Sequence, residues 1–253
     1  MSRAEARTLI SEGEIRVDGV IVGKPARQVH PGQAIVVVGK QKYVGRGAYK
    51  LLGALDGFAY DPSEDRCLDV GASTGGFTDV LLQAGASHVV ALDVGHGQLH
   101  ERIRADERVT VIEHTNMRHV KAGDLGDPFD LVVVDASFIS LRTLMPSMCE
   151  QLGADGILMA LIKPQFEVGR KAASQGKGVI SDVELWRTSI DGVIDAAEAE
   201  GLRLVALLAS PITGGDGNVE YLGKFARIAS SEPVINRTGA VNVVISEATP
   251  EEQ

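Results

Sequence analysis

Four charged residues stand at or near the ends of apolar stretches of the sequence. They are Asp69, Asp93, Asp135 and Lys163. In an open α/β sheet, ligands bind outside the carboxyl ends of the strands, so these side chains are expected along one edge of a sheet. Buried charges need partners, and packing alone is a poor explanation for four of them. The pattern therefore predicts a site that binds a polar ligand or performs acid–base chemistry.

A glycine-rich turn, GASTGG at residues 71–76, follows the first of these stretches. Its glycine spacing differs from the GxGxxG of dinucleotide sites, and Asp69 stands just before it, where a carboxylate repels phosphate and attracts an ammonium group. Asp93 lies at the distance along the chain that suits ribose hydroxyls. An ammonium group and an unphosphorylated ribose together describe S-adenosylmethionine. The residues expected to contact this cofactor are Asp69, Gly71, Ser73, Gly75, Gly76, Phe77, Asp93, Asn116 and Asp135, with Asn116 beside the adenine.

The same turn fits a second motif, because residues 71–75 match the GxSxG nucleophile elbow of α/β hydrolases. That motif needs an acid and then a histidine further along the chain. The last histidine is His119, and the segment from Asp93 to His119 is too short to build the usual triad. The esterase interpretation is therefore disfavoured. The six histidines show no metal-ligand spacing either, so no metal site is predicted.

The elements that position these residues alternate along the chain. Short apolar runs predict strands, and apolar residues three and four positions apart predict helices. The expected strands are residues 67–70, 88–92, 109–112, 129–134, 156–162, 202–208 and 220–225. The expected helices are residues 51–58, 77–84, 144–152 and 183–200. This alternation is typical of an α/β domain.

Residues 1–40 differ from the rest in pattern and in charge. A helix is expected up to Gly13, and Asp18-Gly19 is a strong hairpin signal. Six basic and four acidic residues give this segment a formal charge of +2, whereas the whole chain carries −9. The pattern SRxxAxxLIxxGxIxVDG, which starts at Ser2, resembles the S4-type RNA-binding domain, a small α+β fold. The first helix of that family would precede this pattern, so a shortened domain is expected. The alternative is a small cap that only packs on the main domain.

The chain from Arg46 to Phe225 resembles the FtsJ-like RNA 2′-O-methyltransferases, which carry a Lys–Asp–Lys–Glu tetrad. The matching positions are Lys50, Asp135, Lys163 and Glu220, in the order and context of that family. The stretches GASTGGF at 71–77 and KPQFEVG at 163–169 are similar to those of the TlyA, or hemolysin A, group of ribosomal RNA (cytidine-2′-O)-methyltransferases. The resemblance implies a Rossmann-like fold with a mostly parallel seven-stranded sheet. It also implies S-adenosylmethionine as cofactor and ribosomal RNA, or a ribosomal subunit, as partner.

The resemblance assigns the tetrad a catalytic role, and the chemistry agrees with it. A ribose 2′-hydroxyl is a poor nucleophile and a sulfonium methyl is a good electrophile, so the reaction needs positioning and a base. Lys163, buried and near Lys50, is expected to take the 2′-proton. Asp135 and Glu220 are expected to hold the lysines and the hydroxyl in place. The alternative is that the four residues form two structural ion pairs.

Basic residues outside the tetrad are expected to contact RNA. They are Arg3, Arg7, Arg16, Lys24, Arg46, Arg170 and Lys171. The last two belong to a glycine-rich basic loop, residues 165–181, which directly follows Lys163. Such a loop could close over the RNA, and a solvated surface loop is the alternative.

Composition places the chain among globular proteins, with 44% hydrophobic and 23% charged residues over 253 positions. Two cysteines in no metal or redox spacing indicate a reducing compartment. No apolar stretch reaches the roughly 18 residues of a membrane helix, and the amino terminus lacks the apolar core of a signal peptide. A cytoplasmic monomer without membrane contact is therefore expected.

Four segments are predicted: an RNA-binding domain at residues 1–40, a linker at 41–45, a methyltransferase domain at 46–229 and a partly disordered extension at 230–253. The leading function is S-adenosylmethionine-dependent 2′-O-methylation of ribosomal RNA, on cytidine. A non-catalytic RNA-binding or ribosome-assembly protein is the second hypothesis. A membrane-lytic protein, suggested by the hemolysin name alone, is disfavoured because no strongly basic amphipathic helix is present.

Overall fold

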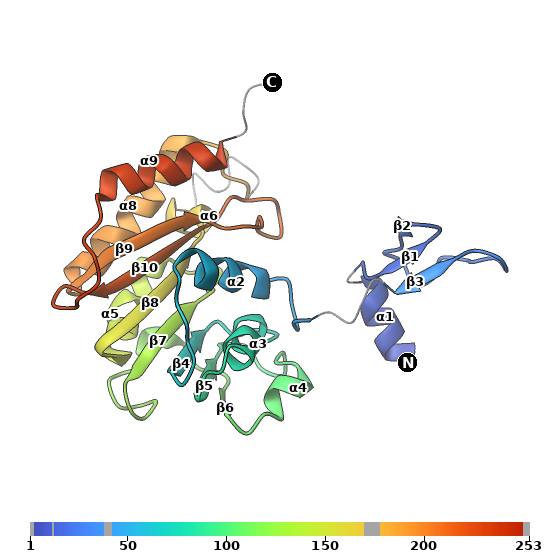
Figure 1. Ribbon diagram of the computed structural model, residues 1–253, viewed down its shortest axis with the longest axis horizontal. Helices are drawn as coiled ribbons and strands as arrows, with labels where there is room; N and C mark the ends of the chain where they lie inside the picture. Colours follow the sequence, from blue (N-terminus) through green and yellow to red (C-terminus); the bar gives the residue numbers. More distant parts are fainter. Residues whose placement is uncertain (1–2, 12, 38–41, 170–177, 250–253) are drawn as a thin grey trace. The chain divides into compact units, whose positions relative to one another are not determined.

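The computed structural model describes residues 3–11, 13–37, 42–169 and 178–249 (Figure 1). The chain divides into two compact units, Met1–Val44 and Gly45–Gln253. Each unit has its own sheet. They are described separately.

The first unit is a helix with a small antiparallel sheet. Its elements are α1 (Arg3–Ser11), β1 (Ile15–Val17), β2 (Val20–Ile21) and β3 (Ile35–Val37), in the sheet order β2-β1-β3. Val17 pairs with Val20, and the two residues between them, Asp18 and Gly19, have φ values of +51° and +80°. Positive φ at both positions is what a two-residue hairpin turn of type I′ requires, so the predicted hairpin is confirmed.

Little apolar surface is buried in this first unit. Ile15, Val17 and Val22 are buried, whereas the strand β3 is exposed along its whole length. Polar contacts supplement this small core. The Asp18 carboxylate accepts hydrogen bonds from the Ala34 backbone and from the Gln33 side chain, which ties the hairpin to the segment before β3.

The second unit is built on seven strands. They are β4 (Arg66–Val70), β5 (His88–Leu92), β6 (Val109–Ile112), β7 (Phe129–Val134), β8 (Leu152–Ile162), β9 (Leu202–Ala209) and β10 (Tyr221–Arg227). Their order is β6-β5-β4-β7-β8-β10-β9, with β10 antiparallel to both neighbours and the other pairs parallel. The predicted α/β, Rossmann-like, mostly parallel sheet is therefore confirmed. The chain reverses its direction of winding between β4 and β7, and open sheets bind ligands at such a point.

Helices cover both faces of this sheet (Figure 1). Those on one face are α2 (Ala48–Gly57), α3 (Gly76–Gln83) and α4 (Glu101–Arg104). Those on the other are α5 (Leu141–Gln151), α8 (Val183–Ala199) and α9 (Arg237–Ala248), together with the short turns η1 (Met117–His119) and α6 (Pro164–Glu167). Side-chain caps start several of them: Ser140 begins α5 and Asp182 begins α8 by accepting a backbone N–H.

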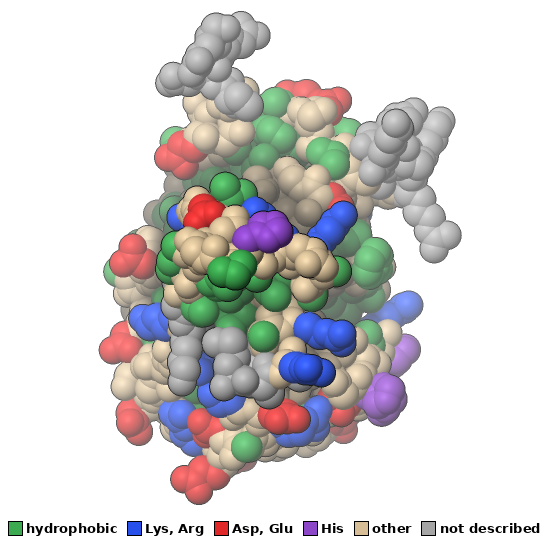
Figure 2. Space-filling model, turned by 90° about the vertical axis from the view of Figure 1, so that its right-hand side faces the viewer, with side chains coloured by type: hydrophobic (Ala, Val, Ile, Leu, Met, Phe, Trp, Pro, Cys, Tyr) green, Lys and Arg blue, Asp and Glu red, His purple; other side chains and the backbone are tan. Residues whose placement is uncertain are grey.

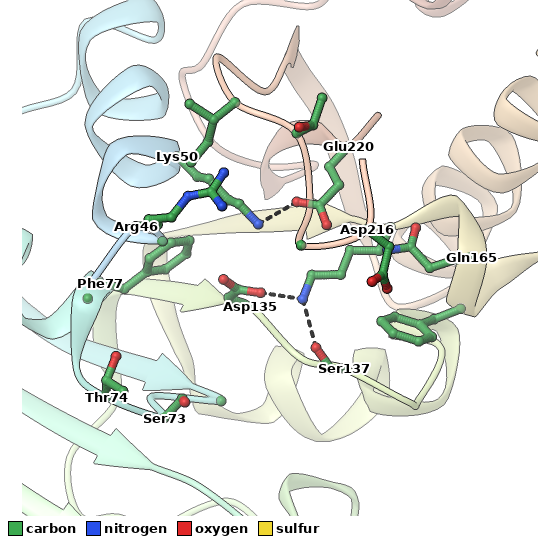
Figure 3. A pocket seen from close by; sticks show the side chains of 18 of the residues that line it. Arg46, Lys50, Ser73, Thr74, Phe77, Asp135, Ser137, Gln165, Asp216 and Glu220 are labelled. Atoms are coloured by element: carbon green, nitrogen blue, oxygen red, sulfur yellow. Dashed lines mark hydrogen bonds and ion pairs between the residues drawn. The ribbon is translucent and has the colours of Figure 1, made fainter. Parts of the chain in front are cut away.

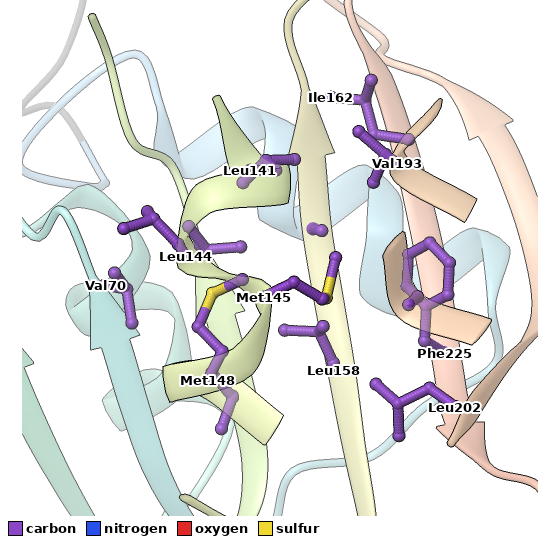
Figure 4. Close-up of a cluster of buried hydrophobic side chains, with 14 of the residues drawn as sticks. Val70, Leu141, Leu144, Met145, Met148, Leu158, Ile162, Val193, Leu202 and Phe225 are labelled. Atoms are coloured by element: carbon purple, nitrogen blue, oxygen red, sulfur yellow. The ribbon is translucent and has the colours of Figure 1, made fainter. Parts of the chain in front are cut away.

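The main hydrophobic core lies between the sheet and the helices α5, α8 and α9. Figure 4 shows Met145 and Met148 of α5 against Val70 and Leu158 of the sheet. These four side chains are almost completely buried. Strands covered on both faces need apolar residues on both sides, which is why the sequence reads as unbroken apolar runs there.

The carboxyl-terminal segment contains a helix that the sequence did not single out. Residues 230–253 were expected to form a partly disordered extension, with the disorder at residues 249–253. Arg237–Ala248 is the helix α9, and residues 250–253 lie outside the described residues. Val241, Val244 and Ile245 of this helix are buried in the main core. Glycine, asparagine and β-branched residues make its sequence a weak helix signal, and packing on β9 and α8 overrides that weakness.

Strand register determines which residues meet at the edge of the sheet. Val70 pairs with Val134, so Gly71 and Asp135 follow side by side. In the antiparallel pair, Tyr221 faces Ile162 at the same edge. Glu220 and Lys163 come next to this pair, one before Tyr221 and the other after Ile162. The antiparallel strand thus brings an amino-terminal strand end to the edge formed by carboxyl-terminal ones.

Candidate active site

A cavity of about 450 Å³ opens at this edge of the sheet, and we call it the reaction cavity. The charged residues that line it are Arg46, Lys50, Asp135, Lys163, Asp216 and Glu220. The four tetrad positions proposed from the sequence thus converge on one cavity (Figure 3). They come from α2, from the ends of β7 and β8, and from the residue before β10.

Lys50 and Glu220 form one ion pair in the reaction cavity. The lysine Nζ lies 2.5 Å from Glu220 Oε2, and both side chains are buried, with 10% and 2% of their surface exposed. Lys50 is buried although it lies in the first turn of α2, where a lysine gains nothing from the helix dipole. The carboxylate of Glu220 offsets the cost of burying that charge.

Lys163 and Asp135 form the second ion pair. Lys163 Nζ lies 2.5 Å from Asp135 Oδ1 and also donates a hydrogen bond of 3.0 Å to Ser137 Oγ (Figure 3). The lysine is buried and the Asp135 carboxylate is partly open, with 20% of its surface exposed. The lysine Nζ lies 5.8 Å from the centre of the Phe166 ring. The charge of each lysine is therefore balanced by its own carboxylate, and neither lysine depends on the other for a partner.

The glycine turn lies beside the second ion pair. Gly71 has a φ of +84°, and a Cβ built on it would lie 2.7 Å from the carbonyl oxygen of Asp135. Glycine is therefore required where the turn passes the end of β7. Gly71, Ser73, Gly76 and Phe77 all line the reaction cavity, as does Asp135. These five predicted cofactor contacts are thus brought together at one edge.

Gly75 lines neither the reaction cavity nor the second cavity that adjoins it. It has a φ of +94° and precedes the first residue of α3, and a Cβ on it would lie 2.9 Å from Leu99. Gly75 therefore shapes the turn, and its direct contact with the cofactor stays a prediction.

Asp69 also lies away from both cavities, and its contact with the cofactor stays a prediction. It is absent from the lining of both cavities, and it lies fully buried under the turn. Its Oδ2 accepts hydrogen bonds from the Thr78 backbone N–H and hydroxyl, at 2.9 and 2.6 Å. Burial, with the nearby negative charges of Asp135 and Asp93, raises the pKa of Asp69 to about 7 despite the Thr78 hydrogen bonds. Asp69 therefore holds the start of α3.

A second cavity of about 550 Å³ adjoins the reaction cavity and shares Gly71, Ser73, Asp135, Ser137 and Phe138 with it. Its remaining lining includes Asp93, Asn116 and the apolar Leu92, Val94, Met117, Ile139 and Leu144. An apolar space with a few polar groups at its edge is what a nucleoside needs.

Two predicted cofactor residues, Asp93 and Asn116, line this second cavity. Asp93 accepts hydrogen bonds from the backbone N–H groups of Ser73 and Gly95, at 2.8 and 2.7 Å. Asn116 starts the turn η1 by accepting the Arg118 N–H. The contact between Asn116 and adenine stays a prediction.

The lining also includes residues that were not singled out from the sequence, among them Ser137, Phe138, Phe166 and Asp216. Phe138 is 92% exposed and has a φ of +65°, which is costly for a residue with a bulky side chain. Its ring lies 5.2 Å from that of Phe166. Ser137 and Phe138 lie two and three positions after Asp135, so their place near a strand-end acid was the available signal.

The basic residues expected to bind RNA lie in different places. Arg3, Arg7, Arg16 and Lys24 are exposed on the first unit, and Arg46 lines the reaction cavity. Arg170 and Lys171 lie outside the described residues. The loop predicted from residue 165 begins with the helical turn α6 instead. On the face shown in Figure 2, basic side chains are interspersed with acidic and hydrophobic ones.

In the part of the chain that the structure describes, no group of three or more His, Cys, Asp or Glu side chains is arranged to hold a metal ion. None of the described helices combines the length and the apolar character needed to span a membrane.

The fold and the site together define a class. A seven-stranded sheet with one antiparallel strand, and a glycine turn at the point where the winding reverses, is the architecture of S-adenosylmethionine-dependent methyltransferases. A Listeria monocytogenes protein described as such an enzyme shares the fold, with a TM-score of 0.53 at 12% identity over 72% of this chain and 99% of its own.

Family models give the particular group. The model of FtsJ-like methyltransferases matches residues 43–227, and the S4 domain model matches residues 2–35. The chain belongs to the FtsJ-like methyltransferase family, and within it to the group that includes TlyA. The 16S/23S rRNA (cytidine-2′-O)-methyltransferase TlyA of Mycobacterium tuberculosis is 47% identical over 87% of this chain and 82% of its own. The resemblance seen in the sequence is therefore confirmed.

A solved structure extends the similarity to almost the whole chain. A candidate hemolysin from Streptococcus thermophilus has a TM-score of 0.80 and 33% identity, over 97% of this chain and 90% of its own. The hemolysin name and the methyltransferase name thus occur among relatives of one fold.

Proposed function

We propose that the protein transfers the methyl group of S-adenosylmethionine to a ribose 2′-hydroxyl of ribosomal RNA, on cytidine. The observation that carries this proposal is the convergence of Lys50, Asp135, Lys163 and Glu220 on a cavity that adjoins the glycine turn. The name of the Mycobacterium tuberculosis relative supports the choice of ribosomal RNA and cytidine.

The residues of the second cavity fit S-adenosylmethionine. Gly71 and Ser73 offer a turn against which a ligand can lie closely, and Asp93 offers a carboxylate for ribose hydroxyls. The apolar walls suit an adenine ring. Bound there, the cofactor supplies an electrophilic methyl group on a sulfonium. Asp135, which lines both cavities, lies where the methyl donor and the RNA would meet.

Lys163 is the proposed base. Lys163 acts after its ammonium has released one proton to solvent: the 2′-O–H bond breaks and its proton goes to the neutral Nζ, while the oxygen forms its bond to the methyl carbon and the carbon–sulfur bond breaks. Asp135 stabilises the ammonium that results, because its carboxylate already lies 2.5 Å from Nζ. A positioned base of this kind contributes roughly 10²–10⁴ to the rate.

Lys50 and Glu220 form the opposite wall of the same cavity. Their enclosed ion pair fixes α2 to the residue before β10, which keeps the two walls of the reaction cavity at a constant separation. A rigid wall holds the ribose in line for attack, which is the larger part of what this reaction needs.

Phe138 is the proposed contact for the target base. An exposed aromatic ring beside a polar cavity is uncommon in a monomer surface, and nucleobases stack on such rings with about 1–3 kcal/mol each. A base that is unstacked from its RNA neighbours could lie on Phe138 while its ribose enters the reaction cavity. The left-handed backbone at Phe138 turns the ring toward solvent.

The substrate partner in this proposal is ribosomal RNA or a ribosomal subunit, and the exposed Arg3, Arg7, Arg16 and Lys24 support it. Basic side chains on an S4 domain bind phosphates. Because the RNA substrate is cytoplasmic, we place the activity there, and we propose that a monomer performs it.

The proposal can be tested by incubating the protein with ribosomal subunits and S-adenosylmethionine carrying a labelled methyl group. Mass spectrometry of nuclease fragments is expected to show the label on the ribose of one or a few cytidines. Naked ribosomal RNA, small subunits alone and large subunits alone serve as controls for substrate choice. A label on a base would overturn the 2′-O assignment.

If no label appears, isothermal titration with S-adenosylmethionine separates two explanations. Binding without transfer would indicate an unsuitable RNA substrate in the assay and calls for assembly intermediates as substrates. Absence of both would favour a non-catalytic RNA-binding protein, and a liposome-leakage assay covers the lytic hypothesis.

A further inference from the structure

Ser137 stands at the junction of the two cavities. It lines both, and its hydroxyl accepts a hydrogen bond from Lys163 Nζ at 3.0 Å. Asp135 Oδ1, at 2.5 Å, is the other acceptor for that nitrogen among the described residues. The tetrad of the family does not include a serine, so the role of this contact has to be derived from its geometry.

The number of hydrogens on the lysine nitrogen determines what the contact with Ser137 can do. An ammonium carries three N–H donors, whereas a neutral amine carries two N–H donors and one lone pair. Asp135 and Ser137 accept one N–H each. A neutral Lys163 held by both acceptors therefore has its lone pair in the third tetrahedral direction. Since Lys163 lines the reaction cavity, that direction is the one left for a substrate.

We propose that Ser137 is a positioning residue that keeps the lone pair of Lys163, and not an N–H, directed at the ribose 2′-hydroxyl. This inference rests on the proposed function of Lys163 as the base. Without the serine hydroxyl, rotation about the Cε–Nζ bond is free to turn an N–H toward the 2′-oxygen, which blocks proton transfer. After the transfer, the three N–H groups of the ammonium face Asp135, Ser137 and the methylated oxygen.

The fold holds Ser137 firmly enough for this role. On one side, the Asp135 backbone N–H donates to the Val70 carbonyl at the end of β4. On the other, Ser140 caps α5 and its hydroxyl donates to the buried Glu167 carboxylate at 2.5 Å, and Glu167 also accepts the Leu141 N–H at 2.7 Å. The short segment that carries Ser137 is thus fixed at both ends.

Two substitutions of Ser137 separate the effect of losing its hydroxyl from the effect of changing the size of its side chain. Ser137→Ala removes the acceptor, and Ser137→Thr keeps it. Ser189→Ala is a matched control, because it removes a buried serine hydroxyl in α8 that lines neither cavity. The measurements are kcat and KM for methylation of the ribosomal substrate, S-adenosylmethionine affinity by titration, and thermal unfolding of each variant.

Ser137→Ala is expected to lower kcat by roughly 10- to 100-fold, a part of the whole effect of a base, with KM and cofactor affinity changed less than about twofold. Ser137→Thr is expected to restore most of the rate. In single-turnover assays, the alanine substitution is expected to have no further effect when Lys163 is already replaced by Met, because the two residues act as one unit.

Three results would overturn the inference. They are a wild-type kcat for Ser137→Ala, a loss of cofactor affinity that matches its loss of rate, or a folded Ser137→Thr variant that is as slow as alanine. The proposed function fails on a different result, namely wild-type protein that leaves ribosomal RNA without a 2′-O-methyl group.

Discussion

The two ends of the reaction cavity hold ion pairs of equal length and different surroundings. Lys50–Glu220 and Lys163–Asp135 are both 2.5 Å long, and both lysines are buried. The carboxylate of Glu220 is enclosed, with 2% of its surface exposed, whereas that of Asp135 has 20% exposed. Lys163 also has a second acceptor in Ser137.

From this difference we infer that the environment of the carboxylate, and not the length of the ion pair, is what would separate a structural pair from a reactive one. A closed pair whose members satisfy each other resists any change of charge, because removing one partner leaves a buried charge alone. An open pair can exchange a proton, since water and substrate reach its carboxylate. Substitutions at the two ends should therefore affect different properties.

The largest effect is expected at the open end. Lys163→Met should lower kcat by roughly 10²–10⁴, because the base is removed. Stability should change little, since the partly exposed Asp135 that remains is solvated. Steady-state kinetics and urea unfolding measure both properties, with S-adenosylmethionine titration as the control for an intact cofactor site. Turnover at the wild-type rate would reject Lys163 as the base.

Substitutions in the enclosed Lys50–Glu220 pair should mainly change the stability of the protein. Glu220→Leu leaves Lys50 buried without its partner, which is expected to lower the free energy of unfolding by about 3–5 kcal/mol. The double variant Lys50→Met with Glu220→Leu should recover most of that loss and remain slow, because the wall of the cavity is altered. Urea unfolding of the three proteins tests this. A single variant as stable as the wild type would contradict the distinction between the two ends.

A third carboxylate, Asp69, lies buried under the glycine turn, and it should make the stability of the protein depend on pH. Its pKa in the folded protein is raised to about 7, while the unfolded chain has an ordinary value near 3.8. The folded state therefore binds the proton more tightly, and stability falls as pH rises from about 4 to about 7. The slope is at most about 1.4 kcal/mol for each pH unit.

Asp69→Asn removes this titration. Urea unfolding at pH 5, 6, 7 and 8 should show the wild type losing stability relative to the variant up to about pH 7, with a constant difference above it. Parallel pH profiles for the two proteins would mean that Asp69 is ionised throughout the range.

The smallest effect is expected for substitutions in the first unit, which contains neither ion pair. Replacing Arg7 and Arg16 of the first unit by Ala should raise KM for the ribosomal substrate by about two- to fivefold and weaken its salt dependence, because phosphate contacts are lost. The rate at saturation should stay the same. Lys121→Ala, an exposed charge removed from the second unit, is the control. An equal effect of both changes would argue against a specific role of the first unit.

Strands could be predicted because they are buried on both faces. The runs at β5, β6 and β7 are mostly apolar, with His88, Thr110 and Asp130 as exceptions, and each of the three predicted strands is found in the structure. The tetrad was found by resemblance, and the structure adds that it forms two separate pairs. That pairing depends on the antiparallel register of β10, which no local pattern contains.

What the sequence did not determine has a common cause. Asp69 and Gly75 were predicted as ligand contacts from their position near a strand end, and neither lines a cavity, because sequence position does not tell on which side of the turn a residue lies. Ser137 was overlooked because its contact with Lys163 joins residues 26 positions apart, at the ends of different strands, which no local pattern shows. The helix α9 was missed because its residues favour a helix only when packed on the sheet.

The ion pair between Lys50 and Glu220 also has a consequence for the order in which the protein becomes active. Its two members are separated by 170 positions in the chain. During synthesis the first unit and α2 are complete while the glutamate has not yet been added, so a growing chain can present its S4 domain before it has a closed cavity. Methyl transfer is therefore acquired last, after nearly the whole polypeptide has been made.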